Sequence, residues 1–314
     1  MVITSILFVV GFYILIKGAN LLVKGASSVA RRFHVSSFLI GLVIVGIGTS
    51  IPEFATFLIA HFIDGEVGLG VIIGSNTFNM LFILGVTALF FPLSMKKEWV
   101  ERDLVWNIFA VGAVMAFALW LGPGLISMLE GVFLLVLFAC WLCVVIKKSN
   151  DLSGEERTIE IKETTLFVSF GFILLGLLGV ILGGKWVVDG AMAMAQEFGM
   201  TQGVIGLTIV GIGTSLPEFI VSFVAAYRKQ AGIAIGNIIG SNIFDFLMIL
   251  GFGAIIKPII FNPYFFFDIV VAFLSAIVLC GLLFVGKKYT LKRWHGICLI
   301  VLYISYIVYI FIRG

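Results

Sequence analysis

Apolar segments long enough to cross a membrane follow one another along almost the entire chain. A transmembrane helix needs about 20 mostly apolar residues. Dividing the 314-residue sequence at its charged or Gly/Pro-rich turns predicts ten spans, at about 2–24, 36–60, 66–92, 104–122, 125–146, 164–188, 201–226, 231–256, 265–286 and 294–312. Backbone groups in lipid must be hydrogen-bonded within the protein. The chain is therefore predicted to be an all-α integral membrane protein with ten transmembrane helices.

The overall composition supports this prediction and excludes other classes. Hydrophobic residues make up 61% of the chain and charged residues only 12%, whereas an average soluble domain is about 25% charged. The net charge of +3 gives no basic surface for nucleic acid. Cys140 and Cys143 have CxxC spacing, but all four cysteines lie in apolar stretches without a nearby His or second CxxC. We expect inert buried thiols and no cofactor.

The distribution of Lys and Arg predicts the orientation in the membrane. Cytoplasmic loops are enriched in these residues. In the ten-span topology, 16 of the 20 fall on one side, and the other side has only Lys17, Lys185, Lys257 and Arg313. Both termini should therefore face away from the cytoplasm. Short loops and the absence of targeting signals point to a multi-pass protein of a prokaryotic plasma membrane.

Two long sequence segments occur twice. Residues 41–54, GLVIVGIGTSIPEF, match residues 206–219, GLTIVGIGTSLPEF, at 12 of 14 positions, and residues 70–85 match residues 236–251 at 11 of 16. Each copy holds five spans, an odd number, so the second copy should enter the membrane in the opposite sense. Inverted repeats of this kind are typical of secondary transporters, whose substrate site lies where the repeats meet. A structural duplication without transport is the weaker alternative.

This duplication predicts the domain organisation. We expect a first five-helix repeat over residues 1–146, a cytoplasmic linker over 147–163 and a second, inverted five-helix repeat over 164–314. The linker is too short and too charged to be a domain of its own.

Three acidic residues lie deep within predicted spans: Glu53, Glu218 and Asp245. Asn79 occupies the repeat position equivalent to Asp245. An ionised carboxylate at the bilayer centre costs several kcal/mol unless it faces the bundle interior and is paired or solvated. No Lys or Arg lies close to these residues within the same span. A bound cation is the natural counter-charge.

Each of the two glutamates follows a sequence that should break its helix. Glu53 and Glu218 come directly after GTSIP and GTSLP. Proline removes a backbone donor and clashes with the carbonyl four residues earlier, which frees the carbonyls of Gly48 and Gly213. Broken membrane helices are tolerated where they line a cavity or an ion path. The freed carbonyls are suitable ligands for hard cations.

A second polar segment, Gly-Ser-Asn, precedes Asn79 and Asp245 in the two copies. Ser75 is four residues from Asn79, and Ser241 is four residues from Asp245, so each pair shares a helix face. The small residues could also serve close helix packing. All candidate ligands are oxygen atoms, which favours Ca²⁺ over Zn²⁺ or copper. The same oxygens could hold Na⁺.

The duplicated GxGTSxPE and GNxxGSNxxD segments resemble the alpha repeats of the cation/calcium exchanger superfamily, and the resemblance covers nearly the whole chain. It implies that Glu53 and Glu218 coordinate Ca²⁺ with the carbonyls of Thr49 and Thr214. It further implies a set of Na⁺ ligands and a remaining central pair. These are Ser50, Ser215, Ser75, Ser241 and the carbonyls of Gly46 and Gly211 for Na⁺, with Asn79 and Asp245 as the pair. Spans one and six would slide against the bundle to open the two faces in turn.

One position departs from this pattern, and the counter-ion stays open. Val71 stands where the second copy has Asn237, which weakens the expectation of a polar contact near Ser75. An Asp at position 245 resembles the sodium/calcium branch, since proton/calcium exchangers usually lack it. An H⁺/Ca²⁺ exchanger and a K⁺-dependent Na⁺/Ca²⁺ exchanger are the alternatives, and a cation channel is the less favoured one. We expect a monomeric transporter of Ca²⁺ and Na⁺, or H⁺, and not an enzyme.

Overall fold

The computed structural model describes residues 2–63, 65–121, 124–147, 164–197 and 211–313. These parts are mostly helical, with short turns and connections and four two-residue strands. Nine stretches among them are long and apolar enough to cross a membrane: Ile6–Arg32, Ser37–Phe62, Gly68–Phe90, Trp99–Leu119, Met128–Lys147, Leu166–Glu197, Ala231–Ile256, Pro263–Leu282 and Arg293–Arg313. Each corresponds to a predicted span. Of the remaining predicted span, 201–226, residues 201–210 lie outside the described part, and the rest holds a short apolar helix, Leu216–Tyr227.

The chain divides into two compact units, and each unit contains residues from both sequence copies. Unit 1 comprises Met1–Pro52 and Asn150–Asn237, and unit 2 comprises Glu53–Ser149 and Ile238–Gly314. The boundaries fall within α4 (Ile51–Ile63) and α13 (Ala231–Ile243).

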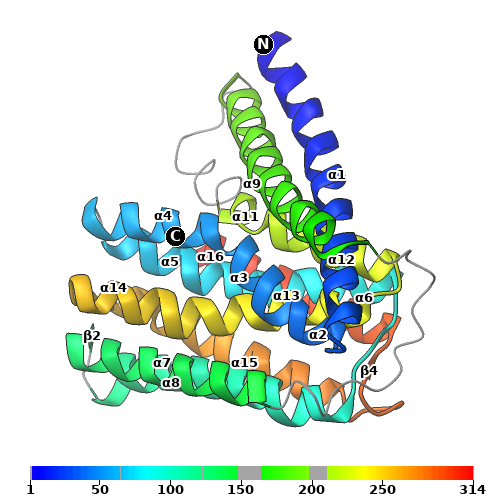
Figure 1. Cartoon of the computed structure of the whole chain (residues 1–314). Helices are drawn as coiled ribbons and strands as arrows, with labels where there is room; N and C mark the ends of the chain where they lie inside the picture. Colours follow the sequence, from blue (N-terminus) through cyan, green and yellow to red (C-terminus); the bar gives the residue numbers. More distant parts are fainter. Residues whose placement is uncertain (1, 64, 122–123, 148–163, 198–210, 314) are drawn as a thin grey trace. The chain divides into compact units, whose positions relative to one another are not determined.

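In unit 1, the long helices α1 (Val2–Arg32) and α9 (Leu166–Glu197) lie side by side (Figure 1). Glycines bring their backbones into contact: a Cβ on Gly18 would lie 2.7 Å from the amide nitrogen of Val180, and one on Gly183 would lie 2.5 Å from that of Leu15. Small residues allow this close approach in membrane proteins, where packing rather than the hydrophobic effect holds helices together.

The end of α1 differs from the prediction. The first span was expected to end near residue 24, whereas the helix continues to Arg32. Its last turn carries Arg31 and Arg32, which complement the negative end of the helix dipole. The boundary was wrong because hydropathy marks the lipid-buried part of a helix, and the hydrogen-bonded helix runs beyond it.

The other helices in the described part of unit 1 are short, and several of them lie around the duplicated GTS segments. They are α2 (Ser37–Ile40), the π-helical η1 (Gly41–Val45), α3 (Gly46–Thr49), α11 (Gly211–Gly213), α12 (Leu216–Tyr227) and the first part of α13. Ser36 caps α2, since its hydroxyl oxygen accepts a hydrogen bond from the Leu39 amide at 3.1 Å.

Unit 2 holds the remaining helices and all four strands. The helices are most of α4, α5 (Gly65–Thr77), η2 (Phe78–Ile83), α6 (Leu84–Phe90), η3 (Trp99–Leu104), α7 (Val105–Ala116), η4 (Phe117–Leu121), α8 (Met128–Lys147), the end of α13, η7 (Phe244–Ile249), α14 (Leu250–Ile256), the 3₁₀ turn η8 (Pro263–Phe265), α15 (Phe266–Leu282) and α16 (Arg293–Arg313). Helix α14 packs beside α8, and α15 beside α7 (Figure 1).

Equivalent positions of the two copies make equivalent contacts within unit 2. Gly85 of α6 meets Gly296 of α16, and Gly251 of α14 meets Gly131 of α8. Strand β1 (Leu93–Ser94) pairs antiparallel with β4 (Thr290–Leu291), and β2 (Leu125–Ile126) pairs likewise with β3 (Ile259–Ile260). The packing therefore follows the sequence duplication.

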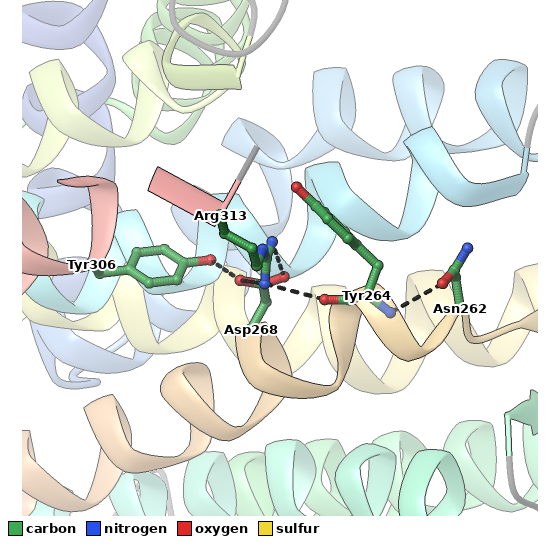
Figure 2. Close-up of polar contacts among 5 residues, drawn as sticks. All are labelled: Asn262, Tyr264, Asp268, Tyr306 and Arg313. Carbon is green, nitrogen blue, oxygen red and sulfur yellow. Dashed lines mark hydrogen bonds and ion pairs between the residues drawn. The ribbon is translucent and has the colours of Figure 1, made fainter. Parts of the chain in front are cut away.

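A buried polar cluster joins α15 to the end of α16. Figure 2 shows the Arg313 guanidinium against the Asp268 carboxylate, at 3.0 Å, and against the carbonyl oxygen of Tyr264, at 3.1 Å. The Tyr306 hydroxyl donates to Asp268 at 3.0 Å. Asp268 lies in the first turn of α15 and is only 4% exposed.

Cys140 and Cys143 on α8 are exposed free thiols, and Cys280 and Cys298 are partly exposed. The expectation of buried thiols was wrong for the CxxC pair. Most of helix α8 is apolar around its whole circumference, so an apolar sequence context does not show which of its side chains are buried.

Candidate ion-binding site

Both GTS segments interrupt their helices at the predicted place. Helix α3 ends at Thr49, Ser50 has φ −81° and ψ 3°, and α4 begins at Ile51. In the second copy, Ser215 has φ −92° and ψ 8° before α12 begins at Leu216. Proline is tolerated in a first helical turn, where its missing amide has no intrahelical acceptor. The break allows each proline to start a new helix.

The breaks place both glutamates in the first turn of the following helix. Glu53 lies in the first turn of α4, and Glu218 in that of α12. Unpaired amides give this end of a helix a partial positive charge, which favours a carboxylate. Glu53 is 1% exposed and Glu218 is 0% exposed. Each carboxylate is thus buried at a helix start.

Asn79 and Asp245 both lie in π-helical segments. Asn79 is in η2 and Asp245 in η7, two six-residue segments at equivalent positions of the repeats. Single π-helical turns within α-helices are frequent at functional sites. Both side chains are 1% exposed. Proline and glycine signals do not mark these segments, so the sequence did not predict them.

In unit 1, polar side chains of the two copies come together. The Ser50 hydroxyl donates to the Glu218 carboxylate at 3.4 Å. The Thr49 hydroxyl lies 3.0 Å from the side-chain oxygen of Asn237. Two residues of the first GTS segment therefore contact the second copy, and one of these contacts joins two predicted site residues.

In unit 2, two contacts between the Gly-Ser-Asn segments follow the repeat. The Asn76 amide donates to the Asp245 carboxylate at 3.0 Å, and the Asn79 amide donates to the side-chain oxygen of Asn242 at 3.1 Å. Asn76 is equivalent to Asn242, and Asn79 to Asp245. The two hydrogen bonds therefore join the same two repeat positions. The acceptor is the carboxylate of Asp245 in one bond and the amide oxygen of Asn242 in the other.

The other predicted ligands have the following places. Ser75 and Ser241 are buried in α5 and α13, and the Ser75 hydroxyl donates to the carbonyl of Ile72 at 3.1 Å. Ser215 is buried and Thr214 is partly exposed. Gly46 and Gly211 begin α3 and α11. The proposed pairing of Glu53 with Glu218 stays a prediction.

The chemistry of these residues is that of hard oxygen ligands. In the described parts of the chain, no three His, Cys, Asp or Glu residues cluster as a metal site. The Glu218 carboxylate contacts the Ser50 hydroxyl, and the Asp245 carboxylate contacts the Asn76 amide. Carboxylate, hydroxyl and amide oxygens suit Ca²⁺ or Na⁺ and not the softer metals.

Two buried residues near Glu218, Ser222 and Asn237, were not among the predicted site residues. The Asn237 amide donates to the Glu218 carbonyl at 3.2 Å and to the Ser222 hydroxyl at 2.9 Å. The sequence did mark Asn237, because the equivalent residue of the first copy is the apolar Val71. That difference was interpreted as bearing on Ser75, whereas in unit 1 Asn237 contacts Thr49, Glu218 and Ser222.

Comparison with known proteins shows which family the chain belongs to. The family described as "Sodium/calcium exchanger protein" matches residues 3–147 and 168–312, which is nearly the whole chain. The chain belongs to the sodium/calcium exchanger family. This membership assigns it to a class of membrane transporters and not to an enzyme class.

Individual members of the family align over most of their length. An uncharacterised membrane protein of Methanocaldococcus jannaschii is 33% identical over 95% of this chain and 94% of its own. The sodium/calcium exchanger MaX1 of Methanosarcina acetivorans is 29% identical over 98% of both. The solved structure of the sodium-calcium exchanger NCX_Mj, soaked with zero Na⁺ and Ca²⁺, superimposes with a TM-score of 0.85 at 31% identity, covering 99% of this chain and 100% of that one.

Proposed function

We propose that this family member is a secondary antiporter that exchanges Ca²⁺ for Na⁺ by alternating access. The observation that carries the proposal is the burial of three carboxylates, Glu53, Glu218 and Asp245. Two of them, Glu218 and Asp245, contact polar side chains of the other copy. Charged side chains buried within membrane spans are costly and mark ion pathways. The names of the relatives support Ca²⁺ and Na⁺ as the transported ions.

In this proposal, Glu53 and Glu218 are the central Ca²⁺ ligands, together with the carbonyls of Thr49 and Thr214. A second group holds Na⁺: Ser50, Ser215, Ser75, Ser241 and the carbonyls of Gly46 and Gly211. Asn79 and Asp245 complete the centre. The 3.4 Å contact between Ser50 and Glu218 supports competition between the two ions, because it joins a Na⁺ ligand to a Ca²⁺ ligand. About six to eight oxygens at about 2.3–2.6 Å are typical of Ca²⁺.

Exchange rather than leak follows from the charge of the site. Without an ion, the three carboxylates would carry about three negative charges, and moving them through a dry barrier is too costly. Only the loaded states would cross the membrane. Counter-transport is then obligatory, since the site returns only with another ion bound.

The identity of the counter-ion rests on Asp245. An Asp at this position resembles the sodium/calcium branch, and its carboxylate accepts a hydrogen bond from the Asn76 amide at 3.0 Å. The alternative is an H⁺/Ca²⁺ exchanger in which protons take the place of Na⁺ on the carboxylates. K⁺-dependent exchange is a further variant, supported only by partial matches to mammalian sodium/potassium/calcium exchangers that cover 39% of this chain or less.

The test is ⁴⁵Ca²⁺ uptake into proteoliposomes of the purified protein. Vesicles loaded with Na⁺, or with acid, are diluted into buffer lacking the gradient ion, at a membrane potential clamped with valinomycin and K⁺. We expect uptake driven by the Na⁺ gradient. Uptake driven only by the pH gradient would contradict Na⁺/Ca²⁺ exchange and show an H⁺/Ca²⁺ exchanger instead.

The carboxylates are tested in the same assay. Glu53→Gln and Glu218→Gln keep the shape of the side chain and remove its charge, and each should lower Na⁺-driven uptake at least about 100-fold, since a lost charge–ion contact costs about 3 kcal/mol or more. The Glu101→Gln variant is the control, because Glu101 is an exposed side chain. Full uptake by the Glu218→Gln protein would contradict the proposal.

A further inference from the structure

The amide of Asn237 connects both copies of the GTS segment within unit 1. Its side-chain oxygen faces the Thr49 hydroxyl at 3.0 Å, and its nitrogen donates to the Glu218 carbonyl at 3.2 Å and to the Ser222 hydroxyl at 2.9 Å. Ser222 in turn donates to the carbonyl of Ala234 at 3.1 Å. Each proton of the amide nitrogen therefore has an acceptor, which fixes the orientation of the Asn237 side chain.

This network is buried and draws on three segments of the fold. Thr49, Ser222 and Asn237 are all 0% exposed. They come from α3, α12 and α13. Breaking a hydrogen bond in such a place leaves a buried polar group without a partner, which costs more than the bond itself contributes. The network thus resists separation of the three segments.

Two glycines make the contact with Thr49 possible. A Cβ on Gly236 would lie 2.8 Å from the Leu42 amide, and a Cβ on Gly41 would lie 2.8 Å from the Cα of Ile233. The backbone of α13 therefore touches that of the first GTS helix region. Residue 237 follows directly after this contact, and only a short polar side chain is needed to reach Thr49.

The first copy lacks the equivalent network. At the same repeat positions, Val71 replaces Asn237 and Phe57 replaces Ser222. Phe57 is fully buried, and its ring packs against Gly253 of α14. The polar pair of one copy is an apolar pair in the other. The turn that carries Glu218 is consequently braced by hydrogen bonds, while the corresponding positions beside the Glu53 turn are filled by packing.

We propose that Asn237 is a positioning residue that fixes the Glu218 turn to Thr49 and thereby sets the size of the cation that the site prefers. The inference rests on the proposed function, in which Glu218 and Thr49 are Ca²⁺ ligands. Asn237 does not touch the ion. It binds the backbone carbonyl of Glu218 and the hydroxyl of Thr49, two residues that contact the ion through other atoms. The distance between these two ligands therefore depends on Asn237.

Ca²⁺ and the larger Sr²⁺ distinguish this role from simple stabilisation. A rigid set of oxygens selects by the metal–oxygen distance, whereas a flexible set accepts a wider range. Releasing the Glu218 turn should weaken Ca²⁺ binding more than Sr²⁺ binding. A purely structural defect would lower the amount of active protein and leave the ratio of the two affinities unchanged.

The experiment measures KM for Na⁺-driven Ca²⁺ uptake, and inhibition of that uptake by Sr²⁺, in proteoliposomes. Asn237→Val places the residue of the first copy at position 237. We expect its KM for Ca²⁺ to rise about 10-fold, the value of one buried hydrogen bond, while the inhibition constant of Sr²⁺ changes by less than about threefold. Ser222→Ala removes one contact of the amide and should give a smaller change in the same direction.

The control variant is Val71→Ala, at the equivalent position, which should leave the Ca²⁺ to Sr²⁺ ratio unchanged. If Asn237→Val does not fold, Ser222→Ala carries the test alone. Suppose that the wild-type protein is active and that, in the Asn237 or Ser222 variant, the KM for Ca²⁺ and the inhibition constant of Sr²⁺ change by the same factor or do not change. This result would overturn the inference and leave the proposed function standing. A wild-type protein without Na⁺-driven Ca²⁺ uptake would remove the proposed function and the inference with it.

Discussion

At the scale of single residues, the largely buried pair of Asp268 and Arg313 offers a sharp test of packing in unit 2. Its side chains are 6% and 17% exposed, whereas those of the Lys97–Glu101 pair are 59% and 53% exposed. Removing one member of a buried pair leaves an uncompensated charge, and an exposed pair contributes about 0–1 kcal/mol. The two pairs should respond very differently to the same change.

Arg313→Ala should lower the free energy of unfolding by about 2–4 kcal/mol, because Asp268 loses its counter-charge and α16 its contact with Tyr264. Lys97→Ala should change it by less than about 0.5 kcal/mol. Thermal unfolding in detergent, followed by light scattering or intrinsic fluorescence, measures both. Equal melting temperatures for the two variants would contradict this assignment.

Several residues of the candidate site could be identified from the sequence because their chemistry conflicts with lipid. Glu53, Glu218 and Asp245 are charged within apolar spans, and that conflict is visible without a structure. The role of Asn237 could not be identified in this way, because its contacts depend on the approach of α13 to the first GTS region through Gly236 and Gly41. The contacts of Asp268 could not be predicted for a similar reason, because its partner, Arg313, lies 45 residues further along the chain.

At the scale of elements, the glycine contact between α1 and α9 allows the backbones of these two helices to touch. A Cβ on Gly183 would meet backbone atoms of Leu15 and Gly11 at 2.5 and 2.8 Å. Backbone atoms cannot turn aside as side chains do. If spans one and six slide during transport, as the family resemblance implies, α1 and α9 should move together as one pair.

Gly183→Ala should force the pair apart, lower the melting temperature by several degrees and reduce Ca²⁺ uptake. Gly171→Ala, on the same helix, is the matched control, because no atom lies within 4 Å of its added Cβ. Alanine also favours the helix by up to about 1 kcal/mol over glycine, so this control should be neutral or stabilising. Loss of uptake in both variants would show that the effect is not specific to the α1–α9 contact.

The helix breaks at Ser50 and Ser215 could be predicted because proline acts on its own helix, within four residues. The end of α1 could not, because hydropathy records contact with lipid and not the hydrogen bonds that extend the helix to Arg32. The π-helical turns at Asn79 and Asp245 depend on packing around them, which no residue of the segment signals by itself.

At the scale of the whole molecule, the duplication accounts for most of what was predicted. The repeated segments predicted two copies of the same chemistry, and in both units the described contacts join residues of one copy to residues of the other. The duplication also predicts where the copies should differ in function. Asn79 against Asp245 and Val71 against Asn237 are such differences, and both lie among the candidate site residues or directly beside them.

The central claim is that the transporter switches the ion site from one side of the membrane to the other only when an ion is bound. It is tested by ⁴⁵Ca²⁺ efflux from preloaded proteoliposomes at constant pH, into buffer that contains choline and a Ca²⁺ chelator but neither Na⁺ nor Ca²⁺. We predict efflux no faster than from protein-free liposomes, followed by rapid efflux when Na⁺ is added outside. Protein-dependent efflux before any counter-ion is added would contradict obligatory exchange and favour a channel.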